Sequence, residues 1–273
     1  MQLKVGSSDF RARGLRALPD WVLELFWWLA IFLSPILFLQ GLYVRRVTVR
    51  LPQPEGRNQG LVAGDMLPLQ LLLIGESPVV GIGVAEIGEG LSARVGYHLA
   101  QLSKRQVNWF GAGVNGARIS SLFDRIEELN ALENDFVIVA FGVNDTTGLT
   151  SIRRWRYAVK MLALALGAND GVHVFFSAVP PMEKFIALPQ PLRFLAGVRA
   201  AMLDHALREA VDQSNAHYAE VDHGFDSDHL AADGYHPSAK GCDEWALQLA
   251  RKCQSMIEME RIAKARCRAL GSG

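Results

Sequence analysis

Three side chains that can cooperate in nucleophilic catalysis occur at two places in this chain. Ser77 directly follows an apolar run in the segment 71-LLLIGESPVVGIG-83. Asp233 and His236 lie three residues apart in 233-DGYHPSAKG-241. A carboxylate at this spacing across a tight turn can accept a hydrogen bond from one imidazole nitrogen, which leaves the other nitrogen available as a base. Taken singly, each residue also has a structural explanation, as a helix cap or part of a solvated loop.

A glycine-rich segment could bring a backbone donor to such a site. Gly111, Gly113 and Gly116 in 111-GAGVNGAR-118 match the pattern G-x-G-x-x-G. A dinucleotide-binding fold would place this pattern after its first strand and an acidic residue at the end of the next one. Here Asp135 begins the next strand, so we expect neither nicotinamide nor flavin. We interpret the glycines as allowing a backbone N–H to approach a substrate oxygen.

Asn144 is a second candidate donor. It lies in 142-GVNDTT-147, after another apolar run, where its side-chain amide could face a ligand. Asp145 or Thr146 could instead cap a helix at the same place. The chain has no G-x-S-x-G, so it lacks the nucleophile elbow of the α/β-hydrolases.

A metal site is a weaker possibility. The run 217–236 is rich in acids and histidines, but its spacings match no standard ligand pattern. We therefore expect no metal.

The elements that must position these residues alternate between strands and helices. Five short apolar runs are predicted as strands, at 69–74, 107–110, 136–141, 172–179 and 218–221. Helical patterns cover 86–104, 118–132, 150–168, 191–214 and 238–264. Such alternation predicts an α/β protein in three layers, α/β/α, with a mainly parallel five-stranded sheet. Sites in such sheets form at the carboxyl ends of the strands.

The amino-terminal segment, 1–43, has a different character. Residues 21–39 are apolar except for Glu24 and Ser34, and as a helix they would span about 28 Å. We expect a single membrane-anchoring helix here, flanked by aromatic residues that suit an interface. The alternatives are a helix packed on a soluble protein or one lying in the membrane interface. Basic residues occur on both sides, so the sequence does not indicate the side of the membrane.

Residues 44–68 hold three prolines and three glycines among charged residues, which is typical of a linker. We expect the body of the protein to occupy 69–273.

Composition excludes some partners. Lysine plus arginine and aspartate plus glutamate both number 28, so the net charge is zero and no nucleic-acid partner is indicated. The three cysteines, Cys242, Cys253 and Cys267, form no C-x-x-C, and we interpret them as free thiols.

In this order and on these elements, the motifs resemble those of the SGNH, or GDSL-like, hydrolase superfamily. The resemblance covers roughly 69–258 and leaves the amino-terminal segment outside. Glu76 stands where the family more often has aspartate, a change that we expect to matter little. The four matching blocks are Gly75-Glu76-Ser77, Val114-Asn115-Gly116-Ala117, Gly142-Val143-Asn144-Asp145 and Asp233-Gly234-Tyr235-His236-Pro237.

The resemblance implies a flavodoxin-like fold and a serine esterase or lipase. Ser77 would form an acyl-enzyme, His236 would act as its base, and Asp233 would orient His236. The oxyanion hole would consist of the backbone N–H groups of Ser77 and Gly116 and the side-chain amide of Asn144. No cofactor is implied.

The substrate class is suggested by 179-VPPMEKFIALPQPLRFLAG-197, an apolar connection that could form one wall of an acyl pocket. Short- to medium-chain acyl or aryl esters fit this expectation, and a neighbouring membrane helix would favour lipid or lysophospholipid esters. The alternatives are a carbohydrate O-deacetylase, a thioesterase and a non-catalytic, membrane-tethered binding protein. The sequence does not indicate the oligomeric state.

Overall fold

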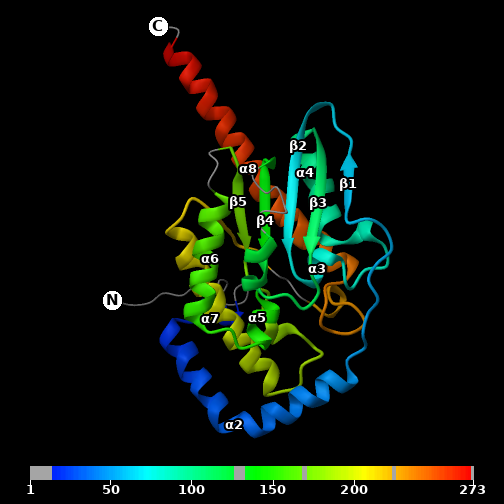
Figure 1. Ribbon diagram of the computed structural model, residues 1–273, viewed down its shortest axis with the longest axis vertical. Coiled ribbons are helices and arrows are strands. Elements are labelled where there is room, and N and C mark those ends of the chain that lie inside the picture. Colours follow the sequence, from blue (N-terminus) through cyan, green and yellow to red (C-terminus); the bar gives the residue numbers. More distant parts are fainter. Residues whose placement is uncertain (1–13, 126–132, 168–170, 223–225, 272–273) are drawn as a thin grey trace.

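A six-stranded sheet runs through the computed structural model, which describes residues 14–125, 133–167, 171–222 and 226–271 (Figure 1). The strand order is β1-β3-β2-β4-β5-β6. Strands β2 to β6 are parallel, and β1 pairs with β3 in the antiparallel direction. The strands are β1 Gln59–Val62, β2 Met66–Gly75, β3 Arg105–Gly113, β4 Phe136–Ala140, β5 His173–Ser177 and β6 His217–Ala219.

Helices cover both faces of this sheet, as the sequence predicted. Helices α6 and α7 share an apolar cluster with one face, and α4 and α8 share another with the opposite face. The α-helices are α2 Asp20–Val47, α3 Ser77–Val80, α4 Leu91–Ser103, α5 Val143–Thr147, α6 Ile152–Leu166, α7 Leu192–Asp212 and α8 Ala239–Gly271. The 3-10 helices are η1 Gly14–Ala17, η2 Ile87–Glu89, η3 Ile119–Arg125, η6 Met182–Lys184 and η7 Ser227–His229.

The alternation of side chains along the strands explains why two layers of helices are needed. In β2, Leu72 and Ile74 belong to one apolar cluster, whereas Leu71 and Leu73 belong to the other. Every residue of β4, with the sequence FVIVA, is buried. A strand that is apolar on both sides must be covered on both sides, which is the signature of a parallel sheet inside an α/β protein.

The prediction of five strands is wrong by one. Strand β1 lies inside 44–68, the segment expected to be a linker, and pairs Gln59 with Phe110 of β3. Strand β1 has only four residues, which alternate between exposed and partly buried positions, and one of them is a glycine. Its sequence therefore lacks the apolar run by which the other strands were predicted. Gly60 allows β1 to lie against Trp109, because a Cβ there would come within 2.9 Å of the indole. We therefore place the start of the sheet domain before Gln59.

The helix expected over 118–132 is also corrected in part. The chain forms the 3-10 helix η3 over Ile119–Arg125, and 126–132 lies outside the described residues. The backbone N–H of Ile119 donates to the buried carboxylate of Asp145, 2.9 Å away. This contact ties the start of η3 to α5, an arrangement that local periodicity could not indicate.

The amino-terminal helix α2 is longer than the predicted 21–39 segment and contains Pro35. By length and composition it is apolar enough to cross a membrane. It packs on α7, where Leu23 is completely buried beside Val198 and Ala201. Figure 1 shows α2 bending beneath the end of the molecule to which the parallel strands point.

Asp204 of α7 connects the helix layer to the loop that follows β5. Its buried carboxylate accepts hydrogen bonds from the N–H of Val179 and the hydroxyl of Tyr218, each at 2.8 Å. Burial raises the pKa of Asp204, against the opposing effect of nearby Arg16.

We predict that Asp204→Ala lowers the free energy of unfolding by about 2–4 kcal/mol, because the buried N–H of Val179 and the partly buried hydroxyl of Tyr218 lose their acceptor. Urea unfolding followed by circular dichroism measures this change. Asp212→Ala, at an exposed position of the same helix, serves as the control and should change stability by less than about 0.5 kcal/mol. Equal effects of the two substitutions would contradict the role given to Asp204.

Candidate active site

Ser77 lies where β2 ends and the short helix α3 begins. Gly75, two residues earlier, passes so close to β4 that a Cβ there would come within 2.5 Å of the carbonyl oxygen of Ala140. Gly81 ends α3 in the left-handed conformation with φ 90°. The two glycines thus allow a tight strand-to-helix turn that carries the serine. Its side chain is almost buried, with 6% of the residue exposed.

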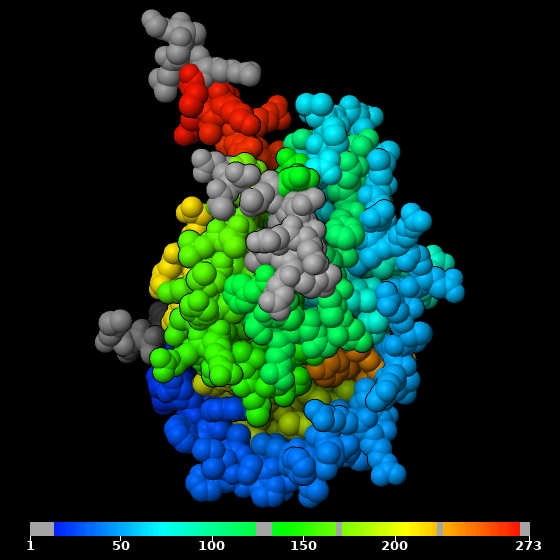
Figure 2. Space-filling model, viewed as in Figure 1, coloured from blue at the N-terminus to red at the C-terminus, as the bar shows by residue number. Residues whose placement is uncertain are grey.

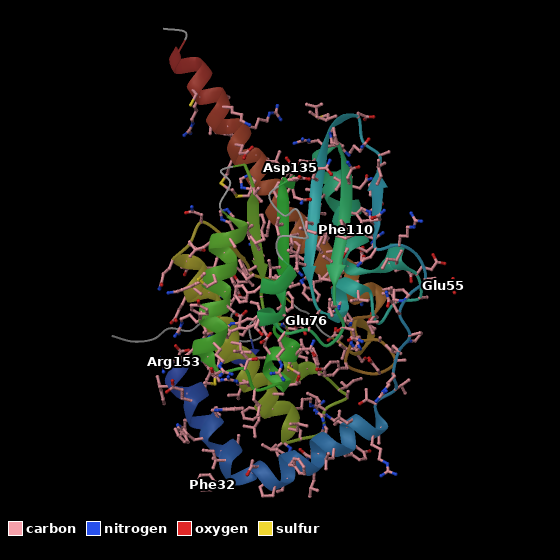
Figure 3. The ribbon with its side chains drawn as sticks, in the orientation of Figure 1. Phe32, Glu55, Glu76, Phe110, Asp135 and Arg153 are labelled. Carbon is pink, nitrogen blue, oxygen red and sulfur yellow. The ribbon has the colours of Figure 1, made fainter. Side chains whose placement is uncertain are left out.

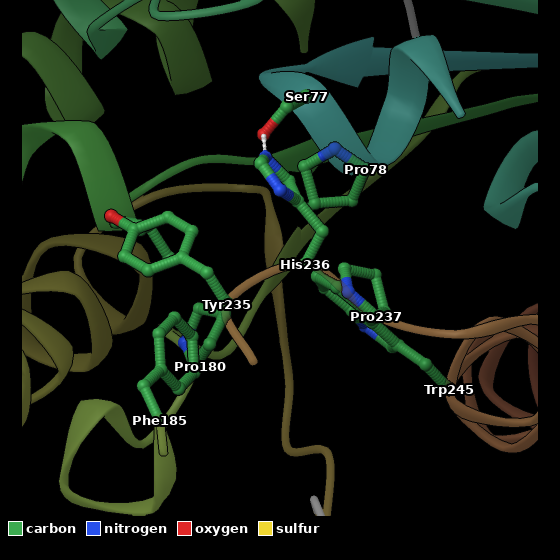
Figure 4. Close-up of a pocket in the computed structure, with 9 residues that line it drawn as sticks. Ser77, Pro78, Pro180, Phe185, Tyr235, His236, Pro237 and Trp245 are labelled. Atoms are coloured by element: carbon green, nitrogen blue, oxygen red, sulfur yellow. Dashed lines mark hydrogen bonds between the residues drawn. The ribbon is translucent and has the colours of Figure 1, made fainter. Parts of the chain in front are cut away.

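The structure brings Asp233 and His236 to Ser77, as Figure 4 shows for the serine and the imidazole. His236 Nε2 and Ser77 Oγ lie 3.0 Å apart, although 159 positions separate them in the sequence. His236 Nδ1 lies 2.6 Å from Asp233 Oδ2. These distances allow Nδ1–H to donate to the carboxylate while Nε2 accepts from the serine hydroxyl.

The turn between Asp233 and His236 holds the carboxylate as well as the imidazole. Gly234 adopts φ 64°, in the left-handed region that favours glycine. Asp233 Oδ1 accepts from the backbone N–H groups of Tyr235 and His236, each at 3.0 Å. Burial opposes ionisation of Asp233, but the hydrogen bonds from His236 and the backbone outweigh it and lower its pKa. The carboxylate is therefore charged and fixed where it can stabilise an imidazolium.

The two other predicted donors lie on neighbouring turns. Asn144 is in the first turn of α5, directly after β4. Gly116 is in the turn after β3 with φ 78°, and the N–H of Val114 in the same turn donates to Gly75 O at 3.0 Å. A hollow lies beside Ser77 and His236, and neither Asn144 nor Gly116 is among the residues that line it. The structure thus places both turns beside the end of β2, with Asn144 and Gly116 outside the lining of the hollow.

Glu76 has a position that the sequence analysis did not anticipate. Its carboxyl oxygens accept hydrogen bonds from the backbone N–H groups of Gly142, Val143 and Asn144, and from the side-chain amide of Asn144. The residue before the serine therefore joins the end of β2 to the start of α5. The second hydrogen of the Asn144 amide remains available to another acceptor. A clue was present in the sequence, because an acid beside a buried strand end needs hydrogen-bond donors.

The environment of Glu76 disfavours its charge. Burial raises its pKa to about 8, since the N–H donors of the α5 turn, led by Asn144, only partly offset the loss of hydration. The buried carboxylate of Asp145 raises the pKa further.

The hollow beside the serine and the histidine is small, mainly apolar and partly open to solvent (Figure 4). Two of its aromatic rings, Phe185 and Tyr235, contact each other edge to face with centroids 5.1 Å apart. Phe185 and Pro180 come from the apolar connection that the sequence analysis expected as a pocket wall. The complete lining is Ser77, Pro78, Val143, Pro180, Phe185, Tyr235, His236, Pro237 and Trp245.

The acid- and histidine-rich run does bring potential metal ligands together. Ligand atoms of Asp226, Asp228 and His229 lie within 4.8 Å of one another, away from the lining of the hollow. Within the described residues Asp228 pairs with Lys240 at 2.5 Å, and His229 pairs with Glu244 at 2.9 Å. These contacts account for the cluster as part of the packing of η7 on α8.

The chain belongs to the GDSL-like lipase/acylhydrolase family, whose model matches residues 73–243. This range contains the strand ends and the turn that carry Ser77, Asn144, Asp233 and His236. The family resemblance inferred from the sequence motifs is therefore confirmed.

A curated relative and two solved structures extend the comparison. The GDSL-like esterase Rv1075c of Mycobacterium tuberculosis is 24% identical over 184 residues, which is 63% of this chain and 57% of the relative. The lipase/acylhydrolase from Enterococcus faecalis has a TM-score of 0.56 at 18% identity, with 69% of this chain and 96% of that chain covered. The Clostridium thermocellum family 3 carbohydrate esterase has a TM-score of 0.53 at 17% identity, covering 67% and 94%. The two structures establish a shared fold.

We predict that Glu76 makes stability fall as pH rises. In the folded chain Glu76 keeps its proton up to about pH 8, whereas the unfolded chain loses it near the ordinary value of 4.5. Between these values the folded state binds more protons, so its stability must decrease with increasing pH.

Urea unfolding of the full chain and of Glu76→Gln, at about pH 5 and about pH 8, isolates this effect. The stability of the parent relative to the variant should be lower at the higher pH. A difference that stays constant would mean that Glu76 does not titrate in this interval.

Proposed function

We propose that this protein hydrolyses carboxylic esters through an acyl-enzyme formed on Ser77. The observation that carries the proposal is the continuous contact from Ser77 Oγ to His236 Nε2 at 3.0 Å and from His236 Nδ1 to Asp233 at 2.6 Å. Membership of a lipase/acylhydrolase family supports the same reaction.

The reaction follows from the roles that these positions permit. Ser77 Oγ attacks the ester carbonyl while His236 Nε2 takes its proton, and Asp233 stabilises the resulting imidazolium. The imidazolium then donates that proton to the leaving alcohol as the acyl-enzyme forms. Water, deprotonated by His236, attacks the acyl carbonyl, and Ser77 departs with the proton while the carboxylic acid is released.

The tetrahedral oxyanion needs donors on the side of the carbonyl oxygen. The N–H of Ser77 opens α3, where a helix leaves its first N–H groups without an intrahelical acceptor. The amide of Asn144 contributes the hydrogen that Glu76 does not bind. For the third donor we propose the N–H of Gly116, because its turn is hydrogen-bonded to the end of β2 through Val114. Each such donor typically contributes on the order of 10²–10³ in kcat.

We predict that Ser77→Ala and His236→Ala each lower kcat for p-nitrophenyl butyrate by roughly 10⁴-fold or more. Asp233→Asn should lower kcat by about 10⁴-fold, because it favours the wrong imidazole tautomer. Steady-state kinetics of the full chain in mild detergent measure these changes. Activity of Ser77→Ala equal to that of the parent would refute the proposed nucleophile.

The apolar lining of the hollow supports an acyl group as its occupant. Phe185, Pro180 and Trp245 present no charged group to the substrate. This lining favours short- to medium-chain acyl or aryl esters over acetylated sugars, which require polar contacts. The carbohydrate esterase of Clostridium thermocellum shares the fold, and carbohydrate O-deacetylation remains the alternative to be tested with acetylated xylan.

We predict that Phe185→Ala raises kcat/KM for p-nitrophenyl octanoate relative to butyrate by roughly tenfold, because removal of the ring opens the wall of the hollow. Phe110→Ala is the matched control, since Phe110 is 42% exposed on β3 and lies well away from Glu76 (Figure 3). The ratio for this control should equal that of the parent. An unchanged ratio in Phe185→Ala would remove Phe185 from the acyl pocket.

Association with a membrane through α2 is part of the proposal. The support is the length and the apolar composition of the helix. Only 6% of its most apolar stretch is buried inside the protein.

A further inference from the structure

Helix α2 carries a continuous apolar stripe on the side that faces away from the protein. Its members recur every three or four residues, which is the spacing of one helical face. Phe32, at the centre, is 82% exposed, and Figure 3 shows it on the outer side of the helix. Figure 2 shows the same helix forming the outer surface at this end of the molecule. The outer stripe consists of Leu25, Trp28, Phe32, Ile36, Leu39 and Tyr43.

The opposite side of α2 is attached to the domain near both ends. Near the first end, Asp20 Oδ1 lies 2.6 Å from His205 Nδ1 of α7, and Leu23 is completely buried. Near the last end, the side-chain amide of Gln40 donates to the carbonyl oxygen of Gln190 at 2.7 Å. The 28 residues would extend about 42 Å, more than the thickness of a bilayer core. Because both ends contact one domain, the docked helix cannot also cross a bilayer.

The residues around the stripe suit a lipid surface. Trp21 and Trp28, 68% and 63% exposed, lie near one end, and Tyr43, 60% exposed, lies near the other. Amphipathic aromatic rings prefer the boundary between headgroups and acyl chains. Arg45 and Arg46 follow in the last turn and are exposed, so they can meet anionic headgroups. This combination of an apolar stripe and flanking cations is typical of a helix that lies in the membrane plane.

The same helix adjoins the wall of the candidate active site. Gln40 accepts a hydrogen bond from the N–H of Leu192 at 3.1 Å, at the end of the connection that contributes Phe185 to the hollow. Ile186, next in that connection, is 55% exposed. Figure 1 shows α2 passing beneath the carboxyl ends of the strands, where Ser77 lies. Any external surface that contacts the outer stripe of α2 would therefore lie near the hollow beside Ser77.

We propose that α2 lies in the plane of an anionic lipid membrane, with its outer stripe among the acyl chains, and that the Ser77 site takes amphiphilic esters from this membrane. The first part stands on the contacts and exposure of α2 alone. The second part rests on the proposed esterase function.

Vesicle binding tests the surface. The full-length parent should sediment with vesicles of phosphatidylcholine and phosphatidylglycerol, and less with phosphatidylcholine alone. The variant Phe32→Ser/Ile36→Ser/Leu39→Ser should bind at least about tenfold more weakly, because it removes apolar area from the bilayer. The control Leu61→Ser/Met66→Ser/Leu67→Ser alters exposed apolar residues on β1 and at the start of β2, and should bind like the parent. Unchanged activity on soluble p-nitrophenyl acetate would verify that both variants fold.

Labelling tests the orientation. Pro19→Cys and Val49→Cys are combined in one chain with Cys267→Ser, since Cys242 and Cys253 are buried. A membrane-impermeant maleimide added outside intact vesicles should label both new cysteines of one molecule, as mass spectrometry would show. One label per molecule until detergent is added would mean that α2 spans the bilayer, and would overturn the proposal.

Two further outcomes separate the parts of the proposal. Ser77→Ala should bind vesicles like the parent. Vesicle binding by a parent that hydrolyses no ester would refute the esterase but not the membrane surface. If the triple stripe variant binds vesicles normally and its particle mass in detergent halves, the stripe joins two copies of the chain and the membrane assignment fails. Hydrolysis of an ester embedded in vesicles should fall by about tenfold in the stripe variant while hydrolysis of the soluble ester does not.

Discussion

The arrangement of the site depends on the hydrogen bonds that the buried carboxyl group of Glu76 accepts. This group connects the residue before the candidate nucleophile to three backbone N–H groups and the amide of Asn144 at the start of α5. Two strand ends are thereby held as one unit, so that Ser77 and Asn144 keep their relative positions. A buried acid is tolerated only where donors replace water, and the turn after β4 supplies them.

The Asp233–His236 turn is positioned by a different principle. Its internal geometry is local, because the carboxylate accepts from the two backbone N–H groups that follow it and from the imidazole. Its location beside Ser77 comes from the fold, which closes a separation of 159 residues with a contact of 3.0 Å. The fold thus brings a preformed carboxylate–imidazole pair to the candidate nucleophile, Ser77, which a separate turn carries. Electrostatic preorganisation of this kind reduces the reorganisation needed during the reaction.

The amino-terminal helix α2 contacts the domain near the candidate active site on one side and is exposed on the other. One side of α2 packs against α7 and is hydrogen-bonded to the connection after β5, whereas Phe32 and the rest of the outer stripe are exposed on the other side. An apolar surface of this size is unfavourable in water and implies a cover. If the proposed membrane covers this stripe, a poorly soluble ester could pass from the membrane to the hollow beside Ser77 without crossing water.

The sequence by itself determined the α/β class, the parallel strands, the covering helices and the identity of the candidate site residues. Apolar runs such as that of β4 and the four motif blocks are local patterns, and local patterns can be recognised without coordinates. Only the tertiary structure decided that β1 joins the sheet, that Glu76 holds Asn144, and that α2 is docked near both ends. Each of these depends on contacts between segments distant in sequence, for which neither periodicity nor spacing carries a signal. Such contacts arise only after the chain has folded.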